Sequence, residues 1–530
     1  MPSKEDSHRR LGAAWEKTTR WGLLLAIFLL PVLKSVDLPM IGPRLTIVEV
    51  VLLPVTTLWL LGTIRDFRPQ APRLLVDYLL AGFLLVSIAS GWTVLHEQPT
   101  TIALVQFGFE IFTFVYLVLF FVMARGFLAE PSFFKTSLYV WLLALGVVSF
   151  LGLIGIGELF LCHRPLSALV NKDNARLILT LRNPNQAALY LLPTMLFFGA
   201  LWFSGQELPR WRRWLPIVLL VAVIALYFTG SKGGWMGWAA GMIPLVWIGW
   251  RQRRTWISLG IVLLVVLGLW FAVSVARTEG NVCLRYLART TYAVTVDLPS
   301  VMDTLSQRAV KWLSFENLGK SVSITTSKSP EGGEGVAIDE SPEGEESIDL
   351  DSIDLEAIDS MRGGYSKTVS GRTISGGVTR LILANYTLRI VKKHPLIGIG
   401  LGTMELYMDE LTGIKPTTAH NTFLTLWAET GSIGVLFFAG AILLSLLTGL
   451  RNIRQAHTPF ERAVGWGLLS ALLGLLVIGL THDAQRQRLM WLLMAMIFAQ
   501  RERLRCSLDG QAQRESSGLD GLPLTLPADG

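Results

Sequence analysis

Apolar stretches long enough to cross a lipid bilayer recur along most of this 530-residue chain. A membrane-spanning helix needs about 20 consecutive, mostly apolar residues. Apolar residues make up 51% of the sequence and charged residues 16%, whereas soluble domains carry about 25% charge. We therefore predict an all-α, polytopic integral membrane protein with about twelve spans. These lie near residues 21–39, 45–64, 74–95, 102–124, 137–159, 186–204, 214–230, 233–250, 256–275, 431–450, 464–480 and 488–500.

The spans divide the chain into five predicted segments. The first span follows charged residues and lacks a small-residue cleavage site, so we expect it to be a retained anchor. The segments are a cytoplasmic N-terminus (1–20), a transmembrane bundle (21–275), a periplasmic loop domain (276–420), a second bundle (421–500) and a cytoplasmic tail (501–530). Within the loop domain, residues 329–360 are acidic and contain no Lys or Arg, which predicts a disordered insert.

Clusters of arginine predict how the chain is oriented. Cytoplasmic loops of membrane proteins carry an excess of Lys and Arg. Placing both termini in the cytoplasm puts five clusters on that side, at Arg65/Arg68/Arg73, Arg210/Arg212/Arg213, Arg251/Arg253/Arg254, Arg451/Arg454/Arg462 and Arg501/Arg503/Arg505. The 160–185 loop, the long 276–420 segment and His420 then face the opposite side, which we call the outer side.

The outer 160–185 loop is basic, which is unusual for a short translocated loop. It carries Arg164, Lys172, Arg176 and Arg182. One interpretation is chance, and the other is a binding site for an anion such as a lipid-linked phosphate. The loop alone leaves both open.

The cysteines predict no metal centre. Cys162 and Cys283 both fall on the oxidising outer side, where a disulfide between them is possible, and Cys506 is predicted to be a cytoplasmic thiol. No Cys/His spacing typical of a zinc site occurs. We expect neither a metal nor a cofactor.

Four short motifs occur in order on the predicted outer side. The last is His420-Asn421, followed after nine residues by Gly431-x-x-Gly434. The others are Arg182-Asn183-Pro184-Asn185-Gln186-Ala187-Ala188, Thr229-Gly230-Ser231-Lys232-Gly233-Gly234-Trp235, and Arg380 followed by His394-Pro395-Leu396-Ile397-Gly398-Ile399-Gly400. Together they resemble the pattern of the O-antigen ligase and polymerase superfamily of bacterial membrane enzymes. The resemblance covers roughly residues 180–450. Lys232 stands where many members have arginine, and the acidic insert is not part of the pattern.

The resemblance implies a fold, a reaction and a set of site residues. The fold is that of a C-type glycosyltransferase in the bacterial inner membrane. The implied reaction moves a glycan from undecaprenyl diphosphate to a hydroxyl of lipid A core, another glycan or a protein on the periplasmic face, without nucleic acid, metal or cofactor. Arg380, Lys232 and Arg182 are predicted to stabilise the leaving diphosphate. His420 is predicted to be the general base, and Asn185 or Asn421 to orient a sugar hydroxyl.

Several alternatives stay open at this stage. His420 could cap the following helix or sit in a satisfied polar network. Arg380 could be an ordinary solvated helix residue, and Lys232 could anchor a helix end by snorkelling. A polymerase of the same superfamily would use the same chemistry with another acceptor. A transporter, for inorganic carbon or another solute, is the alternative from a different class, because Glu110 lies inside the fourth predicted span. Against a transporter, the sequence shows no internal repeat and no pair of broken helices. A non-catalytic scaffold would leave the outer cations unexplained.

Overall fold

The residues that the structure describes are predominantly helical, as predicted. The structure, a computed structural model, describes the backbone of residues 4–32, 35–37, 44–66, 74–161, 167–171, 176–181, 183–206, 211, 213–250, 253–278, 376–412 and 418–516. The described strands are β1 (Ser35–Asp37) and β2 (Arg44–Thr46), which pair antiparallel with Val36 opposite Leu45. The acidic insert, Cys162, Cys283 and Arg182 lie outside the described residues.

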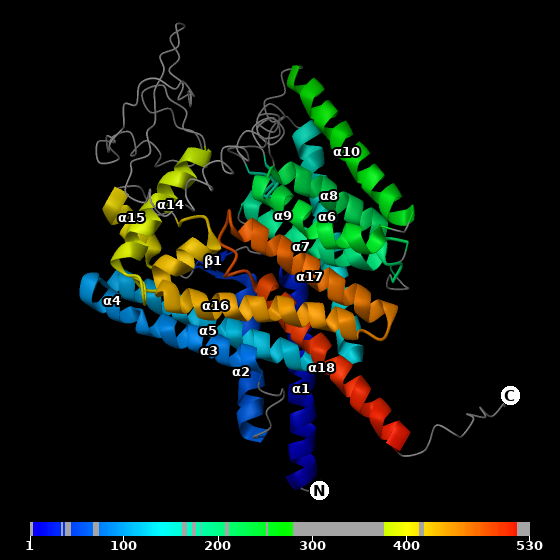
Figure 1. The fold of residues 1–530 in the computed structure, drawn as a ribbon, viewed down its shortest axis with the longest axis horizontal. Helices are drawn as coiled ribbons and strands as arrows, with labels where there is room; N and C mark the ends of the chain where they lie inside the picture. The colour runs from blue at the N-terminus through cyan, green and yellow to red at the C-terminus, as the bar shows by residue number, and fades with distance from the viewer. Residues whose placement is uncertain are drawn as a thin grey trace, which may run out of the picture.

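A helix occupies each of the predicted spans. The helices of the bundle are α1 (Lys4–Leu29), α2 (Ile47–Asp66), α3 (Leu75–Ala89), α4 (Gly91–Glu97), α5 (Thr101–Leu128), α6 (Pro131–Leu161), α7 (Pro184–Phe203), α8 (Leu215–Thr229), α9 (Lys232–Gly249), α10 (Arg253–Thr278), α16 (Thr422–Gln455), α17 (Pro459–Gly479) and α18 (Arg488–Ser516) (Figure 1). Seven described stretches are long and apolar enough to cross a membrane: Ile47–Arg65, Leu75–Glu97, Thr101–Leu128, Pro131–Phe160, Pro184–Phe203, Thr422–Gln455 and Pro459–Gly479. The all-α polytopic class is confirmed, and the number twelve stays a prediction.

Small polar residues fix where several helices begin. Asn183 caps α7, with Pro184 in the first turn, and Ser231 caps α9 by accepting a hydrogen bond from the Gly234 amide. Thr458 and Glu461 form a reciprocal capping box at the start of α17. Each cap accepts hydrogen bonds from amide groups that the first helical turn leaves without partners. An amide without a partner costs several kcal/mol in the apolar part of a bilayer, so these caps matter most where a helix enters the membrane.

Glycine allows three of the central helices to approach closely. α7, α9 and α17 contact one another, and a Cβ placed on Gly237 of α9 would lie 2.5 Å from the Gly474 carbonyl oxygen of α17. In a second group of helices, Phe83 of α3 contacts the rings of Phe114 and Phe438, 5.3 Å away between centroids in each case. Van der Waals packing of this kind holds membrane helices together, because the bilayer provides no hydrophobic driving force between them.

A smaller core lies beside the bundle, at the end that is predicted to face outward. It joins α14 (Gly376–Lys393), α15 (Met404–Thr412) and the first residues of α16 (Figure 1). Its buried side chains include Leu383, Ile390, Ile399, Met408 and Ala428. The described part of the predicted 276–420 domain is therefore packed against the membrane bundle, although the domain boundaries themselves stay predictions.

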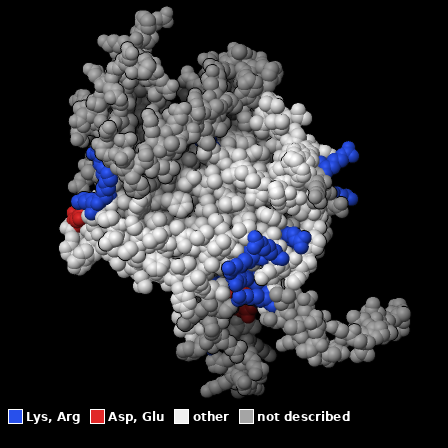
Figure 2. Space-filling view, viewed as in Figure 1, with Lys and Arg blue, Asp and Glu red and all other residues white. Residues whose placement is uncertain are grey.

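The charged side chains are distributed unevenly. Figure 2 shows a broad face with few charges, on which Lys and Arg gather at opposite ends of the molecule. α14 carries Arg389, Lys392 and Lys393 at one end, and the exposed Arg505 and Arg451 belong to the predicted cytoplasmic clusters at the other. An uncharged belt between charged ends is the arrangement that a bilayer requires.

Candidate active site

His420 is an exposed residue that lies just before α16. Its backbone has a φ of +48°, in the left-handed region that is uncommon for residues other than glycine. Its amide donates a hydrogen bond to Thr418 Oγ1 at 3.4 Å. Residues held in such conformations cluster at functional sites, where the surrounding structure over-determines them.

Asn421, not His420, caps α16. Asn421 Oδ1 accepts hydrogen bonds from the amides of Phe423 (3.0 Å) and Leu424 (3.1 Å). Its Nδ2 donates to the carbonyl oxygen of Leu480 at 3.1 Å. The alternative in which His420 caps this helix is therefore wrong. The side-chain amide of Asn421 uses both its oxygen and its nitrogen in structural hydrogen bonds.

The turn between α17 and α18, residues 480–484, is the hub of the site. Thr422 Oγ1 donates to the His482 carbonyl oxygen at 2.9 Å and accepts from the Ala484 amide at 2.8 Å. Asp483 accepts hydrogen bonds from the hydroxyls of Thr425, at 2.9 Å, and Thr418. The Asp483 carboxylate thus bonds to Thr418 before His420 and to Thr425 after it. Because Thr418 Oγ1 also accepts a hydrogen bond from the His420 amide, Asp483 restrains the His420 backbone indirectly.

The Lys232 motif meets the same turn. Lys232 is exposed at the first position of α9, and its neighbour Gly233 packs so tightly that a Cβ there would overlap Thr481 Oγ1. Thr481 Oγ1 in turn lies 2.8 Å from His482 Nδ1. Lys232 and His420 are far apart in sequence, yet both flank the 480–484 turn.

The Asn185 motif packs behind the Lys232 motif. A Cβ on Gly234 would lie 2.9 Å from Ala188 of α7. Arg176 is buried, and its Nε donates to the Thr229 carbonyl oxygen at 2.6 Å while its Nη2 donates to Asn185 Oδ1 at 3.3 Å. Asn185 is therefore held by Arg176, one of the outer-loop cations.

Arg380 lies in the N-terminal part of α14, where its side chain is outside the described residues. The C-terminal half of α14 packs through Leu383 and Ile390 into the small outer core with α16. Arg380 is thus on an element that contacts the His420 helix, and its role stays a prediction.

The glycine-rich loop after His394 is paired with a break in α16. Gly431 has φ +66° and ψ −176°, which interrupts the helix. The freed backbone bonds to the loop: the amides of Ile399 and Gly400 donate to the carbonyls of Ala428 (2.9 Å) and Glu429 (3.0 Å), and the Ser432 amide donates to the Pro395 carbonyl (2.8 Å). We call this pairing of residues 395–400 with 428–433 the loop–helix lock.

Acidic residues inside the spans have arginine partners. Asp77 binds Arg125 at 2.7 Å, Glu110 binds Arg486 at 3.0 Å, and Glu49 binds Arg488. Burial lowers the pKa of Arg486. The negative charges of Glu110, Glu429, Asp483 and Glu405 outweigh that effect and hold the pKa above its ordinary value. Glu110, the residue on which the transporter alternative rested, is thus one half of an ion pair beside the 480–484 turn.

Sequence reasoning missed four residues of this arrangement. His482 and Asp483 matched no motif, Arg486 was not counted among the outer cations, and Arg176 was not assigned to the site. Arg486 had a usable signal, because it lies between two spans on the side that should be poor in arginine. The hydrogen bonds of Asp483 had none, since they join segments separated by 58 and 65 residues.

The O-antigen ligase family model matches residues 217–439. No curated protein matches the chain. The predicted superfamily is confirmed, and with the apolar helices it identifies a multi-pass membrane protein of glycosyltransferase type.

The O-antigen ligase match covers only part of the site. Lys232, Arg380, His420 and Asn421 lie within it, whereas Asn185, Arg182, Asp483 and Arg486 lie outside. The contacts of the 480–484 turn join the two sets. Across the described residues, no group of three or more His, Cys, Asp or Glu side chains is arranged to hold a metal ion.

Proposed function

We propose that the protein transfers a glycan from undecaprenyl diphosphate to an acceptor hydroxyl, of lipid A core or a similar glycan, on the periplasmic face of the inner membrane. The observation that carries the proposal is the convergence of Lys232 and His420 on the 480–484 turn. An exposed cation and an exposed imidazole beside one turn suit a reaction that releases an anion and takes up a proton.

The chemistry balances with these groups alone. The acceptor oxygen attacks the anomeric carbon, and the bond from that carbon to the diphosphate oxygen breaks. The bonding electron pair leaves with the diphosphate, and the acceptor proton passes to the His420 imidazole. Attack opposite the leaving group inverts the anomeric configuration.

The cations act on the leaving group. Charge that develops on the diphosphate is stabilised by donors fixed in advance. Lys232 supplies a point charge at the first turn of α9, where the helix dipole is also positive. Arg380 and Arg182 are proposed to complete the set, with lipid-linked glycan and membrane lipids as partners.

Asp483 is proposed as a positioning residue for His420. It binds Thr418, and Thr418 accepts the hydrogen bond from the His420 amide. A carboxylate that receives two hydroxyl hydrogen bonds makes stronger contacts than a neutral acceptor does. The left-handed backbone of His420 is thereby held in place before substrate binds.

Glycan transfer by the purified chain tests the proposal. A lipid-diphosphate glycan and a core acceptor are supplied, and product is measured for His420→Ala, Lys232→Ala and the control His457→Ala, which alters an exposed histidine at the other end of α16. We expect His420→Ala to lower the rate by at least about a hundredfold, the usual contribution of a general base. Lys232→Arg should retain more activity than Lys232→Ala.

Two results would contradict the proposal. Transfer by His420→Ala at the wild-type rate would exclude the base. Solute uptake into proteoliposomes without any glycan donor, unaffected by Lys232→Ala, would favour the transporter instead.

A further inference from the structure

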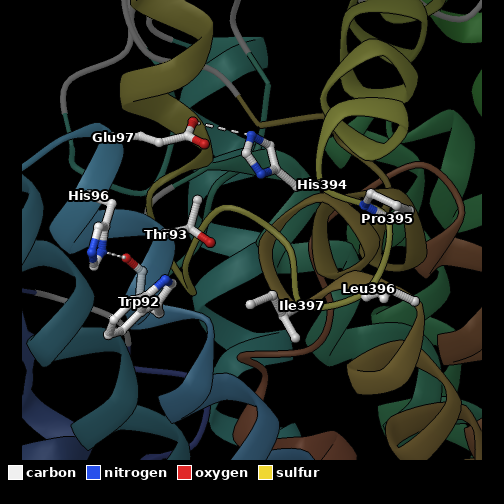
Figure 3. Close-up of a pocket in the computed structure, with 8 residues that line it drawn as sticks. All are labelled: Trp92, Thr93, His96, Glu97, His394, Pro395, Leu396 and Ile397. Atoms are coloured by element: carbon white, nitrogen blue, oxygen red, sulfur yellow. Dashed lines mark hydrogen bonds and ion pairs between the residues drawn. The ribbon is translucent and has the colours of Figure 1, made fainter.

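A cavity opens at the outer end of α3 and α4, beside the loop–helix lock. It has a volume of 370 Å³ and is lined by Trp92, His96 and Glu97 on one side and by residues 394–397 on the other (Figure 3). Ligand pockets begin at about 300 Å³. The cavity is therefore large enough for a sugar ring, and none of the roles assigned above uses it.

One wall of the cavity is a flat aromatic surface. The indole of Trp92 and the imidazole of His96 lie against each other, with centroids 4.0 Å apart and planes tilted by 31°, and His96 Nδ1 lies 2.9 Å from the Trp92 carbonyl oxygen. Trp92 is 64% exposed. The apolar face of a sugar ring packs against such a surface, and the neighbouring imidazole limits how the indole can turn.

Polar contacts of Glu97 join this side of the cavity to His394 on the opposite side (Figure 3). Glu97 Oε2 lies 3.1 Å from Lys393 Nζ, 3.2 Å from His394 Nε2 and 3.2 Å from the Tyr407 hydroxyl. All three contacts fall on one carboxylate oxygen. Burial lowers the pKa of His394, so its ring is neutral at neutral pH. A carboxylate fixed in this way can accept hydrogen bonds from sugar hydroxyls through its other oxygen.

The cavity is coupled to the candidate active site through α16. Pro395 and Leu396, which line it, bond to Ser432 and Ile433 just after the helix break. Residues 422–430 separate that break from His420 and Asn421, and at 1.5 Å per residue this distance is about 13 Å. A glycan a few sugars long can therefore reach from His420 to the cavity.

We infer that this cavity is a saccharide-binding subsite that holds a sugar of the glycan away from the point of transfer. The inference rests on the proposed function, because it takes a glycan as the substrate. The alternative is an ordinary interfacial tryptophan. Trp247 of α9, which is 77% exposed and does not line this cavity, provides a matched control.

The test measures saccharide binding by the full chain in phosphatidylcholine nanodiscs. The probes are a lipid-free core oligosaccharide and a lipid-free O-antigen repeat oligosaccharide. We expect at least one to bind, Trp92→Ala to raise its Kd about tenfold, and Trp92→Phe to restore most of the affinity, since aromatic contacts contribute up to about 1.5 kcal/mol. Glu97→Gln should also weaken binding, whereas Trp247→Ala should not.

Three outcomes would overturn the subsite. These are no binding of either oligosaccharide by the wild type, equal Kd values for Trp92→Ala and Trp247→Ala, or loss of binding when phosphatidylglycerol is added, which would indicate a lipid headgroup site. Transfer assays separate this inference from the function. If Trp92→Ala transfers glycan with an unchanged KM, the proposed subsite is wrong but the proposed function stands. If the wild type binds saccharide but shows no transfer, the proposed function is wrong but the subsite stands.

Discussion

α16 and α17 are neighbouring apolar helices of the bundle, yet they depend on glycine in different ways. In α17, Gly474 and Gly467 keep helical geometry and let α9 and α7 come close. In α16, Gly431 leaves helical geometry and exposes backbone groups to the 395–400 loop. α17 also starts on its own capping box, whereas the start of α16 is tied to the turn after α17. Glycine therefore allows close helix packing in α17, whereas in α16 it creates the break that forms the loop–helix lock.

The largest difference between the two helices should appear with Gly431→Ala. A Cβ at this position would overlap the Leu396 carbonyl group, and the backbone conformation is nearly restricted to glycine. We expect the free energy of unfolding to fall by on the order of 3–5 kcal/mol, from backbone strain and overpacking together. Thermal unfolding in detergent measures it. Gly440→Ala, in the continuous part of α16 with only ordinary contacts, is the control.

Asp483→Ala should have the next largest effect, confined to the start of α16. Its loss removes a charged acceptor from Thr418 and Thr425, which we expect to lower the free energy of unfolding by about 2–3 kcal/mol. The kcat for transfer should fall with little change in KM, because His420 is displaced rather than removed. A wild-type kcat in this variant would show that Asp483 does not position the histidine.

Gly237→Ala tests the helix-packing use of glycine. The added methyl group would meet the Gly474 carbonyl at 2.5 Å without backbone strain, so we expect a loss of about 1–2 kcal/mol. Gly260→Ala in α10, where nothing lies within 4 Å, should be neutral or slightly stabilising. Equal melting temperatures for the two variants would mean that α9 and α17 can separate slightly at no cost.

The smallest effect is expected for Glu405→Gln, and it depends on pH. Burial raises the pKa of Glu405 in the folded protein, so the folded state favours the protonated form. The wild type should then lose stability as the pH rises from the ordinary glutamate pKa through the raised one, and the variant should not. The two melting curves should coincide at pH 4, and at pH 8 the variant should be more stable by under about 1 kcal/mol. A less stable variant at pH 8 would show that Arg486 needs this charge.

The sequence predicted the parts that depend on local composition. Span positions and the all-α class follow from apolar runs, and the superfamily follows from motifs around Lys232, Arg380 and His420. The apolar pattern predicted that the tenth span starts at residue 431, whereas α16 begins at Thr422. The first helical segment, capped by Asn421, was missed because it ends at the break at Gly431. Partners of the 480–484 turn could not be predicted, since they depend on how distant helices pack.

The loop–helix lock is made almost entirely of peptide groups. Amides and carbonyls are the same in every residue, so the lock can tolerate many different side chains at Leu396, Ile397 and Ile433. Only Gly398 and Gly431, which have no room for a Cβ, are fixed by the contact itself. A scan of all substitutions at 396–398 and 431–433 should therefore show two intolerant glycines among more permissive neighbours, which would let the surface beside the cavity diversify while the helix break stays constant.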